Sequence, residues 1–261
     1  LEPRWKVIAI DGESPIRNDF NAENYKLKVR FGWIGDPPGL SAVENAISSG
    51  MINGIKPNRD SEKMTTLVMT GVTALVRATA VRMEQNGVNY PSRDIRDWLV
   101  NADITHISNE VSFSPDCPDP LPSQAALIFC AKPEYMDLFD YIGVDVIELT
   151  GNHEVDWGWD ALKYSLNLYR EHGWVYYAAG NDVANAKAAA TIEHNSNRFA
   201  FIGCNPAGPP MVWAGENRPG VANCDYPWLQ TEIKRLTADG YIVIATLQYY
   251  ESYRHYAENF E

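Results

Sequence analysis

Hydrophobic residues in the second half of the chain alternate between strand-like and helix-like spacing. The runs 65–69, 104–107 and 144–147 are short, apolar and rich in β-branched residues, which predicts buried strands. Between these runs, residues 73–85 and 159–169 carry apolar side chains at helical spacing. Strands that alternate with helices of this length predict a largely parallel sheet covered on both faces.

The same alternation continues toward the end of the chain. We expect helices at 92–99, 134–141, 183–187 and 228–238, strands at 175–178 and 241–247, a turn at 180–181, and a hairpin of 189–194 with 198–204. Proline-rich or glycine-rich segments at 113–127 and 205–225 predict long surface loops.

A different pattern precedes these elements. Residues 5–10 and 25–34 read as two strands joined by a polar stretch, and 41–48 as a short helix. A linker rich in Gly, Asn and Pro follows, up to about residue 62. The sequence therefore predicts a small β-rich segment with its linker over 1–60 and a larger α/β domain over 61–261.

The charge and the lack of long apolar runs exclude some partners. The 261 residues include 34 acidic and 22 basic side chains, a net charge of −12. Nucleic acid and anionic lipid would repel such a surface, so neither is expected as a partner. No run of about 18 apolar residues occurs, so no transmembrane helix is predicted.

The four cysteines lie in or beside the long loops. Cys117, Cys130, Cys204 and Cys224 show no CxxC spacing, which argues against a zinc ribbon. Disulfides in an oxidising compartment and buried free thiols are both compatible with their positions. If disulfides form, we expect the pairs 117–130 and 204–224, because each pair closes a short loop. In the chain-entropy model, each bond would stabilise the fold by about 3 kcal/mol.

Polar side chains follow three of the predicted strands. Asn109-Glu110 and Asn152-His153 each come after a buried strand, and Gln248 with Glu251 follows the last one. Carboxyl ends of parallel strands share one edge of a sheet, where α/β proteins bind ligands. We therefore expect Glu110, Asn152 and His153 to meet in one cleft. In a purely structural interpretation, Asp156 is only the N-cap of the helix that follows.

Four motifs in this order resemble the capsule-synthesis CapA family, also called the poly-γ-glutamate synthesis family. They are Ala102-Asp103-Ile104 with Asn109-Glu110; Gly143-Val144-Asp145-Val146 with Asn152-His153 and Asp156-Trp157-Gly158; the turn at 177–181; and the strand within 242–253. The resemblance covers roughly 65–261. It implies a metallophosphatase-like layered α/β sandwich, because the family belongs to the calcineurin-like metallophosphatase superfamily.

The resemblance also implies roles for individual residues. Members of that superfamily hold two divalent ions such as Mn, Zn, Fe or Mg, which activate a water molecule. Carried over, the metal ligands would be Glu110, Asn152, Gln248 and Glu251. His153 would stabilise the transition state or protonate the leaving group, with Asp156 orienting its ring.

The chain departs from the family pattern at important positions. Gly71-Val72 stands where the family has Gly-Asp, and Gln248 stands where it has histidine. The sequence ends at Glu261, before the family's Gly-x-His-x-His region. Glu251 and His255, four residues apart, form either part of an ion site or a solvated surface pair. These departures predict a degenerate metal site and no competent phosphoesterase.

Three functions therefore remain open. The first is an extracellular or envelope protein of capsule or exopolymer production, with a polyglutamate or carbohydrate polymer as its partner. The second is an active metal-dependent hydrolase of phosphoester or amide bonds. The third is a structural subunit that self-associates or whose sheet is completed by another chain.

Overall fold

The computed structural model describes residues 63–249. From Thr65 onward these residues belong to one compact unit. The strands are β1 (Leu67–Thr73), β2 (Ile104–Asn109), β3 (Val146–Glu148), β4 (Val175–Tyr177), β5 (Ala179–Gly180), β6 (Ala190–His194), β7 (Asn197–Cys204), β8 (Gly220–Val221) and β9 (Ile242–Leu247). The helices are α2 (Arg77–Asn86), α3 (Arg96–Val100), α4 (Asp137–Tyr141), α5 (Trp159–Glu171), α6 (Val183–Lys187) and α7 (Tyr226–Ala238). The predicted elements before residue 61 and the predicted domain boundary lie outside the described residues.

The first sheet is parallel and has the strand order β1-β2-β3-β4. Its central strands are buried on both faces, which explains their nearly continuous apolar sequence. Alternate residues face opposite sides: Ile107 and Ile147 belong to the core on the helical side, whereas Ile104 and Val146 belong to a second core. The sheet is therefore covered on both faces, as predicted.

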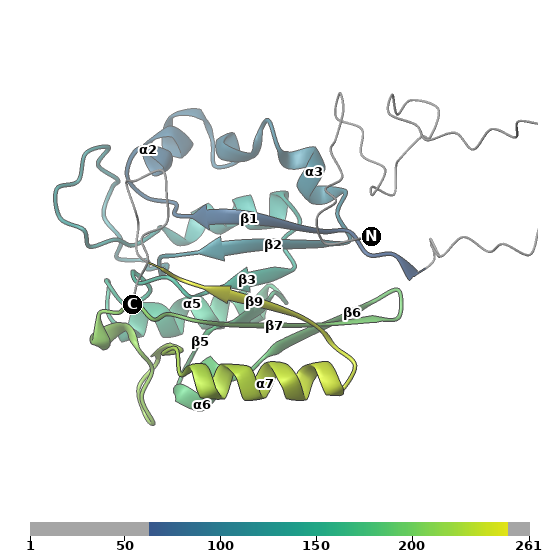
Figure 1. Cartoon of the computed structure of the whole chain (residues 1–261). Helices are drawn as coiled ribbons and strands as arrows, with labels where there is room; N and C mark the ends of the chain where they lie inside the picture. The colour runs from purple at the N-terminus through teal and green to yellow at the C-terminus, as the bar shows by residue number, and fades with distance from the viewer. Residues whose placement is uncertain (1–62, 250–261) are drawn as a thin grey trace, which may run out of the picture. The chain divides into compact units, whose positions relative to one another are not determined.

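Helices cover one face of this sheet and a second sheet covers the other (Figure 1). Met83 of α2, Phe139 of α4 and Leu166 of α5 are buried against the helical face. The second sheet has the order β6-β7-β9, and Phe201 of β7 packs toward the first sheet. On its outer side, Leu229 of α7 belongs to a third core together with residues of β7. The result is a four-layered α/β sandwich.

A chain of hydrogen bonds crosses between the two sheets. The His106 ring lies 2.8 Å from the Tyr177 hydroxyl, which lies 2.9 Å from the Thr246 hydroxyl. Burial lowers the pKa of His106, although the nearby Glu148 acts in the opposite direction. A neutral imidazole therefore joins β2 and β4 to β9.

Several predicted boundaries were wrong. The helix predicted over 73–85 begins at Arg77, because β1 continues through Val72 and Thr73 after a β-bulge. The helix predicted at 92–99 spans only Arg96–Val100, after a 3₁₀ turn. Gly180, predicted in a turn, pairs with Gly220 in a small sheet. Amphipathic spacing did not reveal the extension of β1 or the pairing of Gly180, because both depend on contacts with distant strands.

The hairpin of the second sheet forms between the predicted strands. Asn195 and Ser196 both have positive φ angles and connect β6 to β7 as a two-residue turn. Asparagine tolerates this left-handed geometry better than most residues. No helix within the described range is long and apolar enough to cross a membrane.

The cysteines pair as expected. Cys117 is bonded to Cys130, and Cys204 to Cys224. The first disulfide closes the long loop between β2 and α4, and the second ties the end of β7 to the segment that precedes α7. Both therefore fasten irregular segments onto the layered core.

Candidate functional site

A cavity of about 670 Å³ lies at the carboxyl ends of the strands. We call it the cleft. Its lining includes Glu110 after β2, Asn152 and His153 after β3, and Gln248 after β9. The structure thus brings together the polar side chains that follow three strands far apart in the sequence.

Gln248 joins the other polar residues of the cleft. Its side-chain nitrogen lies 3.3 Å from a carboxylate oxygen of Glu110 and 3.1 Å from the side-chain oxygen of Asn152. Because an ionised carboxylate only accepts hydrogen bonds, the amide group of Gln248 must turn its N–H toward Glu110. The middle of this cluster is therefore occupied by a hydrogen-bond donor.

Gly151 allows the two strand ends to approach each other. A Cβ atom at this position would lie 2.7 Å from Cγ and 2.8 Å from Cα of Glu110. The neighbouring backbone is paired as well, since Val111 and His153 form a parallel bridge. Only glycine fits this contact, which sets the separation between Glu110 and Asn152.

Substituting Gly151 with alanine is expected to lower the free energy of unfolding by about 1 to 3 kcal/mol, because the methyl group would overlap the Glu110 backbone. Chemical denaturation measures the change. Gly71→Ala is the matched control, because no atom lies within 4 Å of a Cβ built at that glycine. An equal loss of stability in both variants would contradict the proposed close contact.

His153 is oriented by two neighbours. Its Nδ1 lies 2.6 Å from a carboxylate oxygen of Asp156, which also accepts the backbone N–H of Phe129 at 3.0 Å. The Phe129 ring meets the imidazole edge to face. A carboxylate at Nδ1 favours the tautomer with its proton there, so Nε2 carries the lone pair. The interpretation of Asp156 as an N-cap was wrong, because Gly158 holds that position.

Sequence reasoning missed Asn205, which fixes two loops of the site. This buried side chain donates to the Thr150 carbonyl at 2.8 Å and accepts the Gly208 backbone N–H at 2.8 Å. It thereby joins the Gly151 turn to the loop containing Gly208, which lines the cleft. The available signal was its position directly after β7, the same kind of strand end that identified Glu110.

Glu154 is a fully buried carboxyl group behind the cleft. Neither of its carboxyl oxygens has a hydrogen-bond partner within the described residues. Burial, together with the nearby Glu110 carboxylate, raises the pKa of Glu154 well above its usual range. Burial and the neighbouring carboxylate thus both favour the neutral form of the Glu154 carboxyl group.

The part of the cleft that lies within the described residues does not by itself supply the ligands of a two-metal centre. Within residues 63–249, no three His, Cys, Asp or Glu side chains gather closely enough to hold a metal ion. Val72, which stands at the family's aspartate position, is 56% exposed and lines a separate apolar groove. Gln248 directs a donor into the cluster, and Glu251 and His255 lie outside the described residues.

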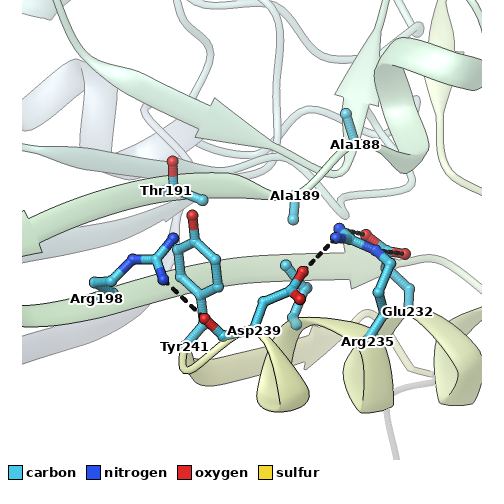
Figure 2. A pocket seen from close by; sticks show the side chains of 9 residues that line it. Ala188, Ala189, Thr191, Arg198, Glu232, Arg235, Asp239 and Tyr241 are labelled. Carbon is cyan, nitrogen blue, oxygen red and sulfur yellow. Dashed lines mark hydrogen bonds and ion pairs between the residues drawn. The ribbon is translucent and has the colours of Figure 1, made fainter.

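A second hollow, of about 610 Å³, lies between α7 and the β6–β7 hairpin (Figure 2). The Arg235 guanidinium contacts Glu232 and Asp239, and Arg198 lies over the ring of Tyr241. These cations are already engaged by neighbouring groups. The hollow therefore offers little uncompensated charge to a ligand.

The layered fold and the polar strand ends define a metallophosphatase-like protein. The family model described as "Bacterial capsule synthesis protein PGA_cap" matches residues 66–261. The chain belongs to this capsule synthesis family, which confirms the resemblance identified in the sequence.

Curated relatives agree with this family. The capsule biosynthesis protein CapA of Bacillus anthracis is 25% identical over 181 residues, covering 68% of this chain and 43% of that protein. The uncharacterized protein y4uA of Sinorhizobium fredii (strain NBRC 101917 / NGR234) is 27% identical over 168 residues, covering 60% of this chain and 35% of that protein. The chain thus spans less than half the length of these relatives.

Proposed function

We propose that this chain is part of an extracellular or envelope protein of capsule or exopolymer biosynthesis, with a degenerate metal site. In this role the cleft binds a polymer, either polyglutamate or carbohydrate, rather than hydrolysing phosphoesters. Membership of the capsule synthesis family supports the biosynthetic role. The two disulfides support an oxidising compartment, where such bonds persist.

The position of Gln248 is the main observation that supports a degenerate metal site. Its amide nitrogen contacts oxygens of both Glu110 and Asn152. A divalent ion held by those two oxygens needs further ligand atoms with lone pairs directed at the ion. The Gln248 amide instead directs its N–H groups toward the position that the ion would occupy. The oxygens of Glu110 and Asn152 therefore accept hydrogen bonds from Gln248, and no tightly bound cation is needed to hold these side chains together.

One observation favours the alternative of an active hydrolase. The oriented pair of His153 and Asp156 has the geometry of a general acid or base, and it opens into the same cleft. With its lone pair at Nε2, such a pair can take a proton from an attacking water molecule, and the protonated ring can then pass that proton to the leaving group. The two functions therefore differ in turnover and in metal stoichiometry.

We expect the purified chain to bind no tight equivalents of Mn²⁺ or Zn²⁺, and to turn over phosphate monoesters and diesters far more slowly than about 1 s⁻¹. Metal analysis, calorimetric titration and an assay with p-nitrophenyl phosphate and its diester check both expectations. His153→Ala is the control, and it is expected to leave any residual rate unchanged. Two bound equivalents, or faster turnover that His153→Ala abolishes, would instead establish the hydrolase.

A further inference from the structure

Two tryptophans are exposed next to the cleft. Trp157 directly follows Asp156, and Trp159 begins α5. They are 38% and 44% exposed. Both line one surface hollow of about 410 Å³, here called the tryptophan hollow. This volume lies within the range of small-ligand sites.

The backbone holds this hollow in shape. Gly158, between the two tryptophans, has a φ angle of 90°, which residues with a Cβ rarely adopt. On the opposite wall, Gly215 and Arg218 are paired through a 2.9 Å backbone hydrogen bond. The Arg218 side chain donates to the Trp213 carbonyl at 2.9 Å, and its guanidinium lies 5.5 Å from the Trp159 ring centroid. The hollow is therefore preorganised before any ligand arrives.

The rim combines aromatic faces with polar groups, of which Arg218 contacts the Trp213 carbonyl and no carboxylate within the described residues. Asp160, Lys163, Asn217 and Arg218 surround the two indoles. Lys163 lies 3.6 Å from the carboxylate of Asp160, so these two charges offset each other. A pyranose has an apolar C–H face and a rim of hydroxyl groups, which matches indole faces bordered by donors and acceptors. A polyanion would need several uncompensated cations, whereas the described residues of the rim offer Arg218 alone on a chain with a net charge of −12.

The tryptophan hollow and the cleft each share lining residues with a third, smaller pocket. Trp157 also lines a narrow pocket of about 40 Å³, together with Arg77. Arg77 in turn lines the cleft. Three adjoining depressions therefore run from the tryptophans to His153, an arrangement that suits an extended chain-like ligand better than a compact one.

We propose that Trp157 and Trp159 form a subsite for a neutral oligosaccharide, which stacks a sugar on the indoles and leads the glycan chain toward the cleft. This inference rests on the proposed function and narrows its polymer to carbohydrate. The indoles supply the apolar contact, and the rim supplies hydrogen bonds to the hydroxyl groups. Neither tryptophan takes part in chemistry at His153.

The subsite is tested by titrating the chain with cellopentaose, maltopentaose and chitopentaose. Tryptophan fluorescence and calorimetry detect the binding. At least one of these probes is expected to bind saturably and to change the indole emission. Trp157→Ala and Trp159→Ala should each weaken that binding about tenfold or more, equivalent to about 1.4 kcal/mol. Trp157→Phe keeps an aromatic face and should retain most of the affinity.

Trp98→Ala is the matched control, because Trp98 is 75% exposed on α3 and lines none of the three depressions. Binding should be unchanged in this variant, and circular dichroism should show that all variants are folded. The subsite is overturned if no probe binds below about 10 mM, or if Trp98→Ala weakens binding as much as Trp157→Ala. Tryptophan-dependent, salt-sensitive binding of a glutamate oligomer in place of the sugars would also overturn it.

The sugar-binding experiment can fail or succeed independently of the metal and turnover assays that test the proposed function. Sugar binding by a chain that also shows metal-dependent turnover would overturn the degenerate metal site and leave the subsite standing. Absence of both sugar binding and turnover would overturn the subsite alone.

Discussion

Replacing Gln248 with histidine is expected to raise the affinity of the cleft for Zn²⁺ about 100-fold, equivalent to about 2.7 kcal/mol. In the unchanged chain, the amide of Gln248 presents N–H donors to Glu110 and Asn152. An imidazole at this position would present a nitrogen lone pair beside the Glu110 carboxylate, and zinc strongly prefers such ligands. Calorimetric titration of the metal-free variant with Zn²⁺ measures the gain.

Gln248→Leu separates ligand addition from loss of the amide. Leucine has a similar size, removes both hydrogen bonds and adds no lone pair, so the Zn²⁺ affinity should stay at the level of the unchanged chain. A thermal shift by Zn²⁺ should likewise appear only in Gln248→His, because a ligand that binds the folded state raises its stability. Equal gains in both variants, or tight Zn²⁺ binding before any substitution, would show that the amide is not what prevents metal binding.

The sequence was sufficient to locate the cleft, because its position depends on the direction of the strands rather than on their exact register. Glu110 and His153 follow parallel neighbouring strands, and the carboxyl ends of such strands share one edge whatever the exact register. Gln248 follows β9, which runs parallel to β7 in the other sheet. Its arrival at the same edge required both sheets to be oriented alike, a feature that periodicity alone does not determine.

Features that depend on long-range contacts were not predictable. Asn205 follows a strand, as Glu110 does, but its hydrogen bond to the Thr150 carbonyl spans 55 residues and could not be predicted from that position. Glu154 is a charged residue type that lies in the polar segment after β3, yet its side chain is fully buried. Asp156 has the residue type of an N-cap, but its carboxylate contacts His153 and Phe129 instead. Each of these environments depends on how distant segments pack, which local residue preference does not determine.

Reducing both disulfides is expected to lower the free energy of unfolding by about 6 kcal/mol, because each contributes about 3 kcal/mol in the chain-entropy model. The bonded cysteines are separated by 13 and 20 residues, so their removal frees two loops in the unfolded chain. A loss of this size is comparable to the whole stability of many domains. Urea denaturation with and without a reductant that does not absorb at the detection wavelength measures it.

The two disulfides are expected to differ in their effect on the cleft. Cys204 is completely buried and directly precedes Asn205, which holds the Gly151 turn. Cys117 and Cys130 belong to the loop that carries Phe129, which packs on His153. Paired Cys204→Ala and Cys224→Ala substitutions should therefore disturb the Gly151 turn, whereas Cys117→Ala with Cys130→Ala should chiefly release the Phe129 side of His153. Hydrogen exchange at the backbone amides of Asn152 and Phe129 distinguishes the effects of the two double variants. If both variants show equal exchange, and if reductant leaves the unfolding midpoint of the unchanged chain where it was, then neither disulfide constrains the site.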